Sequence, residues 1–319
     1  MSKVILITGI GGDISQGVAT ILKENKPDFH LIGVDIHSQH GGHLLVDSYL
    51  EVPKANAFDY LDKINEIIKI YSVDIIIPMT EAELEVTNQL PELAFGVKWI
   101  TAGHQVVKVG LDKLETMHAL KELEIPVPWT KTVSEGLPIN YPCILKNRSG
   151  SGSRAVFTLF NNEEANYLAK QYPDAIFQEL LEPAEREVTC AVYRRRDGDV
   201  TSLLMLRKLT GGFTGWAKVI KDEETFRMCE RIAQGLNLHG SMNIQLRLTE
   251  KGPRVFEINP RFSSTVLMRH RLGFSDLLWA VDEAEEKSIC FPAIKQGQLM
   301  ARVQGAVVFE DIDMRRNEI

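Results

Sequence analysis

Apolar and polar residues along the first hundred positions fall into blocks that predict an α/β domain. Short apolar runs rich in β-branched residues predict buried strands, which we place at residues 4–8, 31–35, 73–78 and 97–101. Helical patterns lie between these runs, one reaching Leu22 and another covering about 58–70. Strands and helices that alternate in this way are typical of a parallel, doubly wound sheet.

The start of this domain outlines a dinucleotide-binding unit. A strand, the glycine turn 9–17, a helix and a second strand that ends in Asp35 follow one another. The glycine spacing departs from GxGxxG, and a glycine turn before a helix is common in any doubly wound sheet. A nicotinamide-dependent oxidoreductase is therefore an alternative that depends on this turn and on Asp35.

Three histidines follow Asp35 at intervals of three, at His37, His40 and His43. Such a group invites a transition-metal interpretation. The glycines at 41–42 break the segment, so no helical face would hold the rings together. We therefore expect a solvated or substrate-facing loop in preference to a metal site.

Thr80 and Glu81 come directly after the third predicted strand. Thr80 and Glu83 fit a capping box, in which each side chain bonds the backbone of the other. Loops at the carboxyl ends of parallel strands also line the ligand crevice of such sheets. We expect Thr80 and Glu81 to contact a substrate there, and the two interpretations are compatible.

A second organisation begins beyond residue 110. Asp112 and Glu115 start a predicted helix that runs to Leu123, and Ile125-Pro-Val-Pro128 breaks it at a subdomain boundary. Apolar strands then flank a Gly/Ser loop over 141–158. This order of strand, loop and strand excludes a Walker-type P-loop, because that loop is followed by a helix. The loop can still close on phosphates with Lys146 as a cation, unless it is only a mobile surface hairpin.

The stretch from Asn243 to Arg261 alternates polar and apolar residues around Glu250-Lys-Gly-Pro253, which predicts a β-hairpin. Pairing across its turn would bring Gln245 close to Glu257. Carboxylate and amide oxygens on one face suit Mg²⁺, although an exposed polar face would give the same pattern. Arg261 favours the metal site, because a cation beside it would serve an oxyanion or acyl phosphate.

Composition narrows the class of protein. A chain of 319 residues with 44% hydrophobic and 25% charged residues can bury a sizeable core and hold two or three domains or subdomains. The net charge of -7 argues against nonspecific nucleic-acid binding. Four scattered cysteines form no CxxC pair, which favours a reducing, cytoplasmic setting. No signal peptide and no membrane segment is expected, because the apolar run 4–10 is too short to span a bilayer.

Two segments carry a resemblance to a known family. Gly240-Ser-Met-Asn-Ile-Gln245 and Phe256-Glu-Ile-Asn-Pro-Arg-Phe-Ser-Ser264 resemble the ATP-grasp superfamily, and within it the synthetase domains of the carbamoyl-phosphate synthase large chain. The resemblance covers nearly the whole chain. It implies a combined α/β and α+β fold: a Rossmann-like preceding domain over 1–110, then a two-lobed ATP-grasp domain over 111–319 with a lid at about 127–182.

The resemblance also implies roles for individual residues. Lys113 and Lys146 would touch nucleotide phosphates, and Lys146 and Arg261 would serve catalysis, with Arg261 steadying an acyl phosphate. Glu187 would bind ribose. The remaining implied contacts are the phosphate loop Ser149, Gly150, Ser151, Gly152 and Ser153, the adenine hinge Gln178, Glu179, Leu180 and Leu181, and the Mg²⁺ ligands Gln245, Glu257 and Asn259. The loop has serine and arginine where further glycines are common in the family.

The implied reaction joins a carboxylate to an amine. The carboxylate attacks the γ-phosphorus of ATP, and an amine then attacks the acyl phosphate, releasing ADP and phosphate. The expected cofactors are ATP and two Mg²⁺ ions, for which Mn²⁺ can substitute. We expect small-molecule partners and a homodimer, with no nucleic acid and no membrane. A non-catalytic ATP-sensing module is the alternative from another class, and a kinase or a carboxylase on this scaffold is an alternative enzyme.

Two further stretches are expected to select the acceptor. The segment 206–218 is predicted to be a glycine-rich loop that carries Arg207 and Thr214 and closes over a carboxylate. Ser263, Ser264 and Arg269 follow the hairpin closely enough to line the same cavity. A solvated helix face is the alternative for Arg269.

Overall fold

The first part of the chain is a parallel sheet, as its apolar pattern predicts. We describe residues 2–90, 94–150, 156–303 and 305 of a computed structural model. The sheet has the order β3-β2-β1-β4-β5, with every neighbouring pair parallel. Its strands are β1 (Val4–Ile7), β2 (His30–Asp35), β3 (Ser48–Glu51), β4 (Ile75–Ile77) and β5 (Lys98–Trp99). Strand β3 was not predicted, because Ser-Tyr-Leu-Glu lacks an apolar run.

Helices pack around this sheet and connect its strands. The predicted helices are confirmed within a few residues at their ends. The helical elements of this part are α1 (Asp13–Asn25), α2 (Tyr60–Tyr71), α3 (Glu81–Thr87), α4 (His104–Gly110) and the short 3₁₀ helices η1 (Gly41–Leu45) and η2 (Ala94–Gly96). The capping box of α3 is confirmed, with Thr80 and Glu83 bonding each other's backbone.

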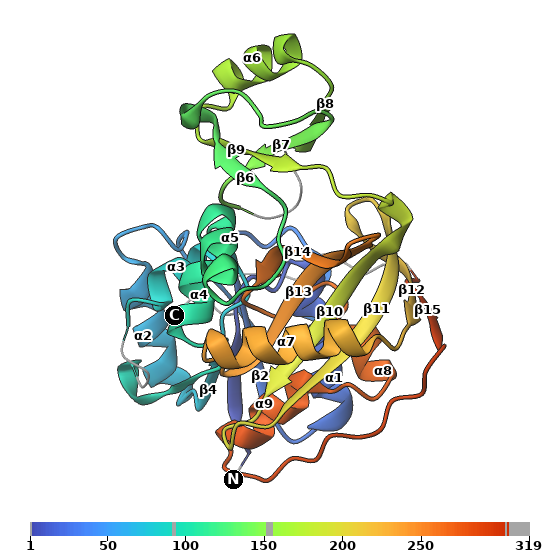
Figure 1. Cartoon of the computed structure of the whole chain (residues 1–319). Coiled ribbons are helices and arrows are strands. Elements are labelled where there is room, and N and C mark those ends of the chain that lie inside the picture. Colours follow the sequence, from blue (N-terminus) through green and yellow to red (C-terminus); the bar gives the residue numbers. More distant parts are fainter. Residues whose placement is uncertain (1, 91–93, 151–155, 304, 306–319) are drawn as a thin grey trace.

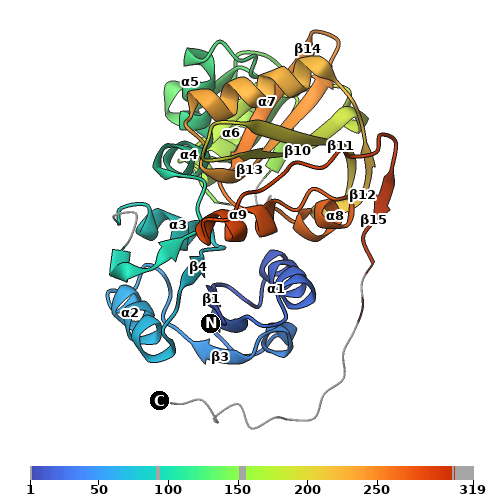
Figure 2. The same cartoon turned by 90° about the horizontal axis from the view of Figure 1, so that it is seen from below.

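A six-stranded antiparallel sheet forms the body of the second part, in the order β14-β13-β10-β11-β12-β15. Helix α7 lies along one of its faces, whereas α8 and α9 lie between this sheet and the parallel sheet (Figures 1 and 2). The elements are α5 (Lys113–Glu122), β10 (Glu187–Arg194), β11 (Val200–Thr210), β12 (Phe213–Val219), α7 (Glu223–Gly235), β13 (Gly240–Thr249), β14 (Gly252–Asn259), α8 (Val266–Arg271), α9 (Asp276–Ala284) and β15 (Leu299–Ala301).

One apolar core joins these two parts. Ile7 and Val18 of the parallel-sheet domain belong to the same buried cluster as Tyr193 and Met205 of the large sheet and Phe274 before α9. A continuous core holds two sheets in a fixed relation, because separating them would expose this surface to water. Among the described residues, no helix is both long and apolar enough to cross a membrane.

A small four-stranded sheet stands apart from the rest, above the large sheet in Figure 1. Its order is β6-β9-β7-β8, and its core includes Cys143, Leu145 and Phe177. Its elements are β6 (Thr130–Thr132), η3 (Val133–Glu135), β7 (Cys143–Asn147), β8 (Val156–Leu159), α6 (Asn162–Gln171) and β9 (Ala175–Glu179), followed by η4 (Ala184–Arg186). The predicted pair of strands around the Gly/Ser loop is confirmed by β7 and β8. The predicted domain and lid boundaries stay predictions.

A buried ion pair fixes α8 and α9 to the large sheet. Arg269 is fully buried and donates to both oxygens of Asp276, from Nε at 2.8 Å and from Nη2 at 2.6 Å. Asp276 also accepts a hydrogen bond from the hydroxyl of Ser241 on β13. Since a buried charge is stable only when it is paired, each partner depends on the other.

Arg269 and Arg271 offer a matched test on one helix. Replacing Arg269 with Ala leaves the Asp276 carboxylate buried and unpaired, and should lower the free energy of unfolding by about 3–5 kcal/mol. Arg271→Ala removes an exposed pair with Glu24 and should cost at most about 1 kcal/mol. Urea unfolding of both variants measures the difference, and equal losses would contradict the role given to the buried pair.

Candidate active site

The polar face of the β13–β14 hairpin forms the floor of the site. Gln245 lies opposite Glu257, and Asn243 lies opposite Asn259, so the predicted pairing of Gln245 with Glu257 is confirmed. Thr249 pairs with Gly252, which leaves two residues at the tip of the turn. The hairpin therefore gathers one carboxylate and three side-chain amides within three consecutive pairing positions.

The pairing shifts by one residue within this hairpin. Gln245 pairs with Glu257 but Leu246 pairs with Val255, which leaves Phe256 as the extra residue of a β-bulge. The Phe256 carbonyl oxygen accepts a hydrogen bond of 3.2 Å from Nζ of Lys146, which lies 5.6 Å from the centre of the Phe256 ring. Strand β7 of the small sheet thus reaches the hairpin through one lysine.

Lys146 is buried although it carries a charge. Burial lowers the pKa of its ammonium group to about 8, while the carboxylates of Glu257 and Glu187 act in the opposite direction and Lys113 adds to the lowering. The electrostatic neighbours of Lys146 therefore include three residues that were expected to serve one site. The structure brings together both predicted phosphate lysines, a predicted metal ligand and the predicted ribose glutamate.

The start of α5 meets the loop after β7. Nζ of Lys113 donates to the carbonyl oxygen of Gly150 at 2.8 Å, and Gly150 has a φ of +90°, which favours glycine. Arg148 donates from Nε to both carboxylate oxygens of Asp112, at 2.9 and 2.8 Å. Sequence reasoning saw Asp112 only as a helix cap and missed this link. Ser149 forms a β-bridge with Asp112, whereas the predicted contacts Ser151, Gly152 and Ser153 lie outside the described residues.

The predicted adenine hinge links the small sheet to the large one. Gln178 is buried, and its Nε2 donates to Oγ1 of Thr130 at 2.9 Å. The chain leaves the small sheet after Glu179, passes Leu180 and reaches Leu181, whose carbonyl oxygen accepts a hydrogen bond of 2.6 Å from Arg247. A backbone segment that spans two lobes in this way sits where a flat ligand could lie between them.

Two arginines hold Glu187 in place. Nη2 of Arg207 lies 2.7 Å from Oε1 of Glu187 and 2.9 Å from Oε1 of Gln245, and Arg247 donates to the other oxygen of Glu187 at 2.5 Å. The side-chain oxygen of Gln245 therefore already accepts a hydrogen bond, from Arg207. Thr214 is buried beside this network, with its hydroxyl 3.4 Å from Nη1 of Arg207.

The prediction of a loop over 206–218 is wrong. Arg207 lies within β11 and pairs with Ala217 of β12, and only the turn at Gly211 and Gly212 interrupts the two strands. Both glycines have positive φ, at 58° and 83°, which is what a tight turn requires. The glycines thus mark the tip of a hairpin. Arg207 belongs to a strand, and its side chain binds Glu187.

The donor set of the hairpin fits a hard divalent cation. Glu257 is half-buried and supplies a carboxylate, and Asn259, which is 6% exposed, supplies an amide oxygen. Within the described part of the chain, the amide nitrogens of Asn243 and Asn259 are buried without a hydrogen-bond partner. These N–H groups need a hydrogen-bond acceptor, such as water or a phosphate oxygen, and do not themselves ligate a cation.

An ion pair joins the hairpin to the parallel-sheet domain. Nη2 of Arg261 lies 3.2 Å from Oε1 of Glu81, the first residue of α3. The neighbouring carboxylate of Glu83 turns inward and accepts hydrogen bonds from Thr8 and Tyr60, so the two glutamates have different tasks. Thr80 is exposed at the same helix start. The carboxyl edge of the parallel sheet and the β13–β14 hairpin therefore face one another.

The residues after the hairpin divide into two kinds. Ser263 is buried, donates to Oδ1 of Asn243 at 3.1 Å and accepts from Nη1 of Arg269 at 2.9 Å. Arg269 has no exposed surface, so in this conformation it positions Ser263 and lines neither a cavity nor a solvated face. Ser264 is half-buried, and its carbonyl oxygen accepts a hydrogen bond from Arg302.

Comparison with known proteins identifies both parts of the chain. Residues 111–265 match the model of the ATP-grasp domain family, and residues 5–100 match the PylC-like, N-terminal domain family. The ATP-grasp resemblance is thereby confirmed, whereas the branch close to carbamoyl-phosphate synthase stays a prediction.

Solved structures with the same fold span nearly the whole chain. N5-carboxyaminoimidazole synthetase from Staphylococcus aureus, solved with ADP, is 17% identical with a TM-score of 0.77, covering 95% of this chain and 83% of that one. L-amino acid ligase from Bacillus licheniformis is 14% identical with a TM-score of 0.70, covering 89% and 74%. The biotin carboxylase domain dimer of Hydrogenobacter thermophilus 2-oxoglutarate carboxylase, solved with MgADP, ADP and bicarbonate, is 17% identical with a TM-score of 0.72, covering 94% and 73%.

The lowered pKa of Lys146 makes a prediction about stability and pH. Below pH 8 the folded protein buries a charged ammonium group, so Lys146→Met should raise the free energy of unfolding by about 3 kcal/mol at pH 7. Between pH 8 and about 10.4 the folded state loses this proton while the unfolded state keeps it, so wild type gains stability and the difference shrinks. Urea unfolding at pH 7 and pH 10 measures both values. A difference that does not depend on pH would contradict the buried charge.

Proposed function

The chain belongs to the ATP-grasp superfamily through its domain at 111–265, and from this premise we propose that it is an ATP-dependent carboxylate–amine ligase. One observation carries the proposal. The ammonium of Lys146 is buried on the hairpin bulge, with Lys113, Glu187 and Glu257 as its electrostatic neighbours. A cation beside a carboxylate that can bind a metal ion suits phosphoryl transfer, because the cation and the ion together neutralise charge on the phosphate oxygens.

The two lysines lie near one loop. The amide of Lys113, at the start of α5, donates to the carbonyl oxygen of Arg148, and Lys146 precedes Arg148 by two residues on β7. A triphosphate beside this loop would meet both positive charges. A bound phosphate favours the charged form of Lys146 and so raises its pKa. Gly150 offers backbone groups beside Lys113, and the segment Gln178–Leu181 offers the surface for the base. Glu187 would accept hydrogen bonds from the ribose hydroxyls, with Arg207 or Arg247 giving up one of the carboxylate oxygens it now holds.

The hairpin supplies the metal ligands. Glu257 and Asn259 would hold Mg²⁺ through their oxygens, with Gln245 joining when its oxygen leaves Arg207. The ion would neutralise charge on the phosphate oxygens. Two ions, and Mn²⁺ in place of Mg²⁺, belong to the same proposal. The MgADP reported with the 2-oxoglutarate carboxylase domain is consistent with this use of the fold.

Arg261 would bind the carboxylate substrate. Its guanidinium already binds one carboxylate, that of Glu81, so the geometry for a carboxylate or an acyl phosphate exists there. A substrate carboxylate would take up the γ-phosphoryl group of ATP beside Lys146, and an amine would then displace phosphate from the acyl phosphate. The reaction needs no nucleophile from the protein. The protein orients the reactants and keeps out water.

The proposed partners are small molecules. The names of the similar synthetase, carboxylase domain and amino acid ligase span several carboxylate or bicarbonate substrates, so the acid and the amine stay open. Thr80, Glu81 and Ser264 are half-buried or exposed and are the proposed acceptor contacts. A homodimer and a cytoplasmic location complete the proposal.

The proposal is tested by ADP release from MgATP with pools of small carboxylic acids, including amino acids, and with hydroxylamine as a generic amine. A pool that stimulates ADP release and yields a hydroxamate establishes the ligase chemistry. If MgATP raises the melting temperature but no pool stimulates ADP release, the ATP-sensing alternative gains support and the ligase assignment fails for these acids.

Glu257 and Glu250 lie on the same hairpin and give a matched pair of variants. Glu257→Gln removes the metal carboxylate and should lower carboxylate-dependent ADP release by at least about a hundredfold, because metal charge stabilisation is worth several kcal/mol. Glu250→Gln changes an exposed carboxylate at the turn and should leave the rate unchanged. Circular dichroism checks that both variants fold. Undiminished turnover in Glu257→Gln would rule out the metal assignment.

A further inference from the structure

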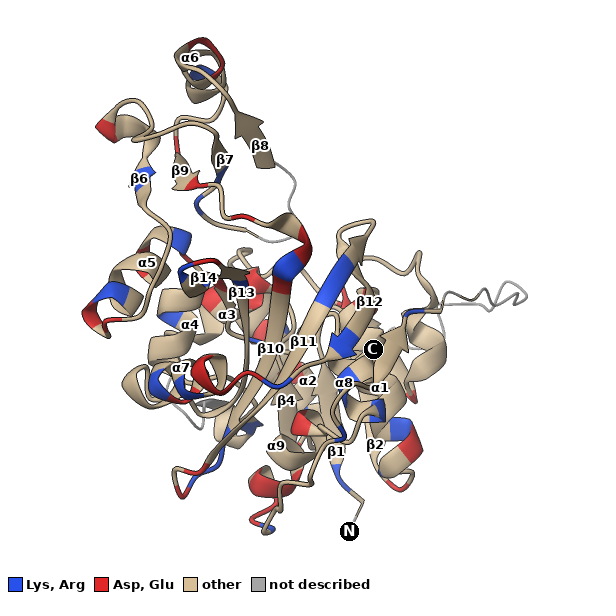
Figure 3. Ribbon diagram, turned by 45° about the vertical axis from the view of Figure 1, so that its right-hand side comes forward, with Lys and Arg blue, Asp and Glu red and all other residues tan. Residues whose placement is uncertain are grey.

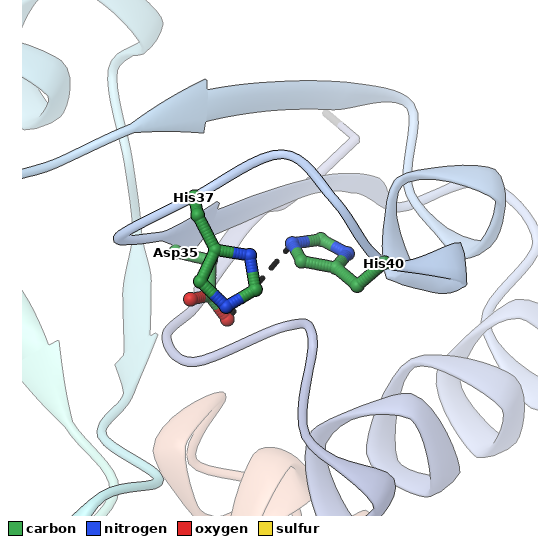
Figure 4. Close-up of side chains that lie close together, drawn as sticks. All are labelled: Asp35, His37 and His40. Carbon is green, nitrogen blue, oxygen red and sulfur yellow. Dashed lines mark ion pairs between the residues drawn. The ribbon is translucent and has the colours of Figure 1, made fainter.

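A second cluster of possible ligands lies in the parallel-sheet domain, outside the ATP-grasp site. Asp35 ends β2, His37 follows it, and His40 is the N-cap of η1. Each offers one ligand atom, and these atoms all lie within 4.8 Å of one another. Figure 4 shows the three side chains converging from one short segment. The rings of His37 and His40 therefore come together without the helical face whose absence argued against a metal site.

The cluster is a built site, because its inner members are buried. The side chains of His40 and Asp35 are 7% and 12% exposed, and Nε2 of His40 lies 4.0 Å from Oδ2 of Asp35. That nitrogen is buried without a hydrogen-bond partner among the described residues. A buried polar atom without a partner is costly, and it faces a carboxylate across a gap too wide for a hydrogen bond.

Backbone contacts hold Asp35 and the loop in position. The amides of Gly11 and Ile36 donate to the two oxygens of Asp35, at 2.8 and 2.7 Å. A Cβ atom on residue 11 would lie 2.6 Å from Cδ2 of His40, so this approach requires glycine. The hydroxyl of Tyr49 donates to the carbonyl oxygen of His37 at 2.7 Å, and its ring packs edge-on against His40. Residues outside the cluster thus hold Asp35 in place and bring His40 close to it.

We propose that Asp35, His37 and His40 bind a divalent transition-metal ion of the zinc class, with a coordination position left for water or a substrate atom. Two imidazoles and one carboxylate form a donor set suited to such ions, whereas Mg²⁺ prefers oxygen alone. Zinc bonds of about 2.0–2.2 Å require the ligand atoms to close by roughly an ångström. His37 is exposed and can make this movement.

Binding at Nε2 of His40 requires one proton to move. The amide of Gly42 donates to Nδ1 of His40 at 3.1 Å, so without a metal the ring proton belongs on Nε2, facing Asp35. The ion needs the lone pair of Nε2, so the single ring proton shifts from Nε2 to Nδ1. The Gly42 contact must open at that step. Gly42 is closely packed, since the position of a Cβ there lies 2.1 Å from the carbonyl oxygen of Ile10, so the contact opens by a movement of the His40 side chain.

The proposed ion would lie at the same edge of the parallel sheet as the substrate contacts proposed above. The turn 9–12 runs between them, since the Cβ position of Gly9 is 2.9 Å from Thr80 and that of Gly11 is 3.0 Å from Asp35. The site nevertheless stands on its own residues and does not depend on the ligase proposal. Its test can therefore use binding alone, with no substrate.

The test is a titration of the whole chain with Co²⁺ and Zn²⁺. Excess Mg²⁺ keeps the hairpin site from contributing, and the visible absorption of Co²⁺ reports nitrogen ligands. We expect one Co²⁺ bound per chain, displaced by Zn²⁺. His37→Ala should weaken binding by at least about tenfold, because losing even a residue that only hydrogen-bonds a ligand costs that much. His118→Ala removes an exposed histidine in α5 and should bind as wild type.

Because His37 is exposed, its replacement should leave the fold intact, which melting in the presence of EDTA verifies. His40→Ala provides a second, buried ligand variant, and it should lose the Co²⁺ absorption band. Equal affinities in wild type and His37→Ala would overturn the proposal. So would the absence of any Co²⁺ or Zn²⁺ binding to wild type under these conditions.

Discussion

The site depends on keeping the ammonium group of Lys146 buried. A charge without water needs compensation from every side, and the structure provides it through a carbonyl oxygen, an aromatic ring and the fields of two glutamates. These partners come from the hairpin and from β10, whereas the lysine comes from the small sheet. The position of the small sheet over the large one is therefore coupled to the electrostatics of the site.

Charged side chains elsewhere in the site are already paired with one another. Arg207 and Arg247 share Glu187, and Arg261 contacts Glu81. Figure 3 shows acidic and basic positions gathered where the ends of β10 and β11 approach the small sheet. A ligand that binds here must break these ion pairs and form its own contacts with the same side chains. Part of its interaction energy therefore only compensates for the pairs that are lost. This arrangement favours a ligand whose charges match the exchanged partners and disfavours neutral molecules.

Sequence reasoning predicted the elements better than the contacts between them. Periodicity was enough for the parallel sheet and for the opposition of Gln245 and Glu257, because both depend on local pattern and short turns. It could not place Arg207, since glycines nearby suggested a loop where a long hairpin forms. It could not find the burial of Arg269, because its partner Asp276 lies on another helix. The gathering of Asp35 and His40 likewise depends on Gly11, which comes from a different strand connection.

The extra residue at Phe256 sets which side of the sheet the ligands face. Side chains along a strand alternate, so unbroken pairing from Thr249 and Gly252 onward would set Glu257 opposite Ile244, a core residue. The shift of one position moves Glu257 and Asn259 together to the side of Gln245. The same residues paired without the bulge would turn a carboxylate and an amide into the apolar core, whereas removal of Phe256 itself would leave Glu257 opposite Gln245. The direction of the ligands therefore depends on the register of the hairpin as well as on the residue types.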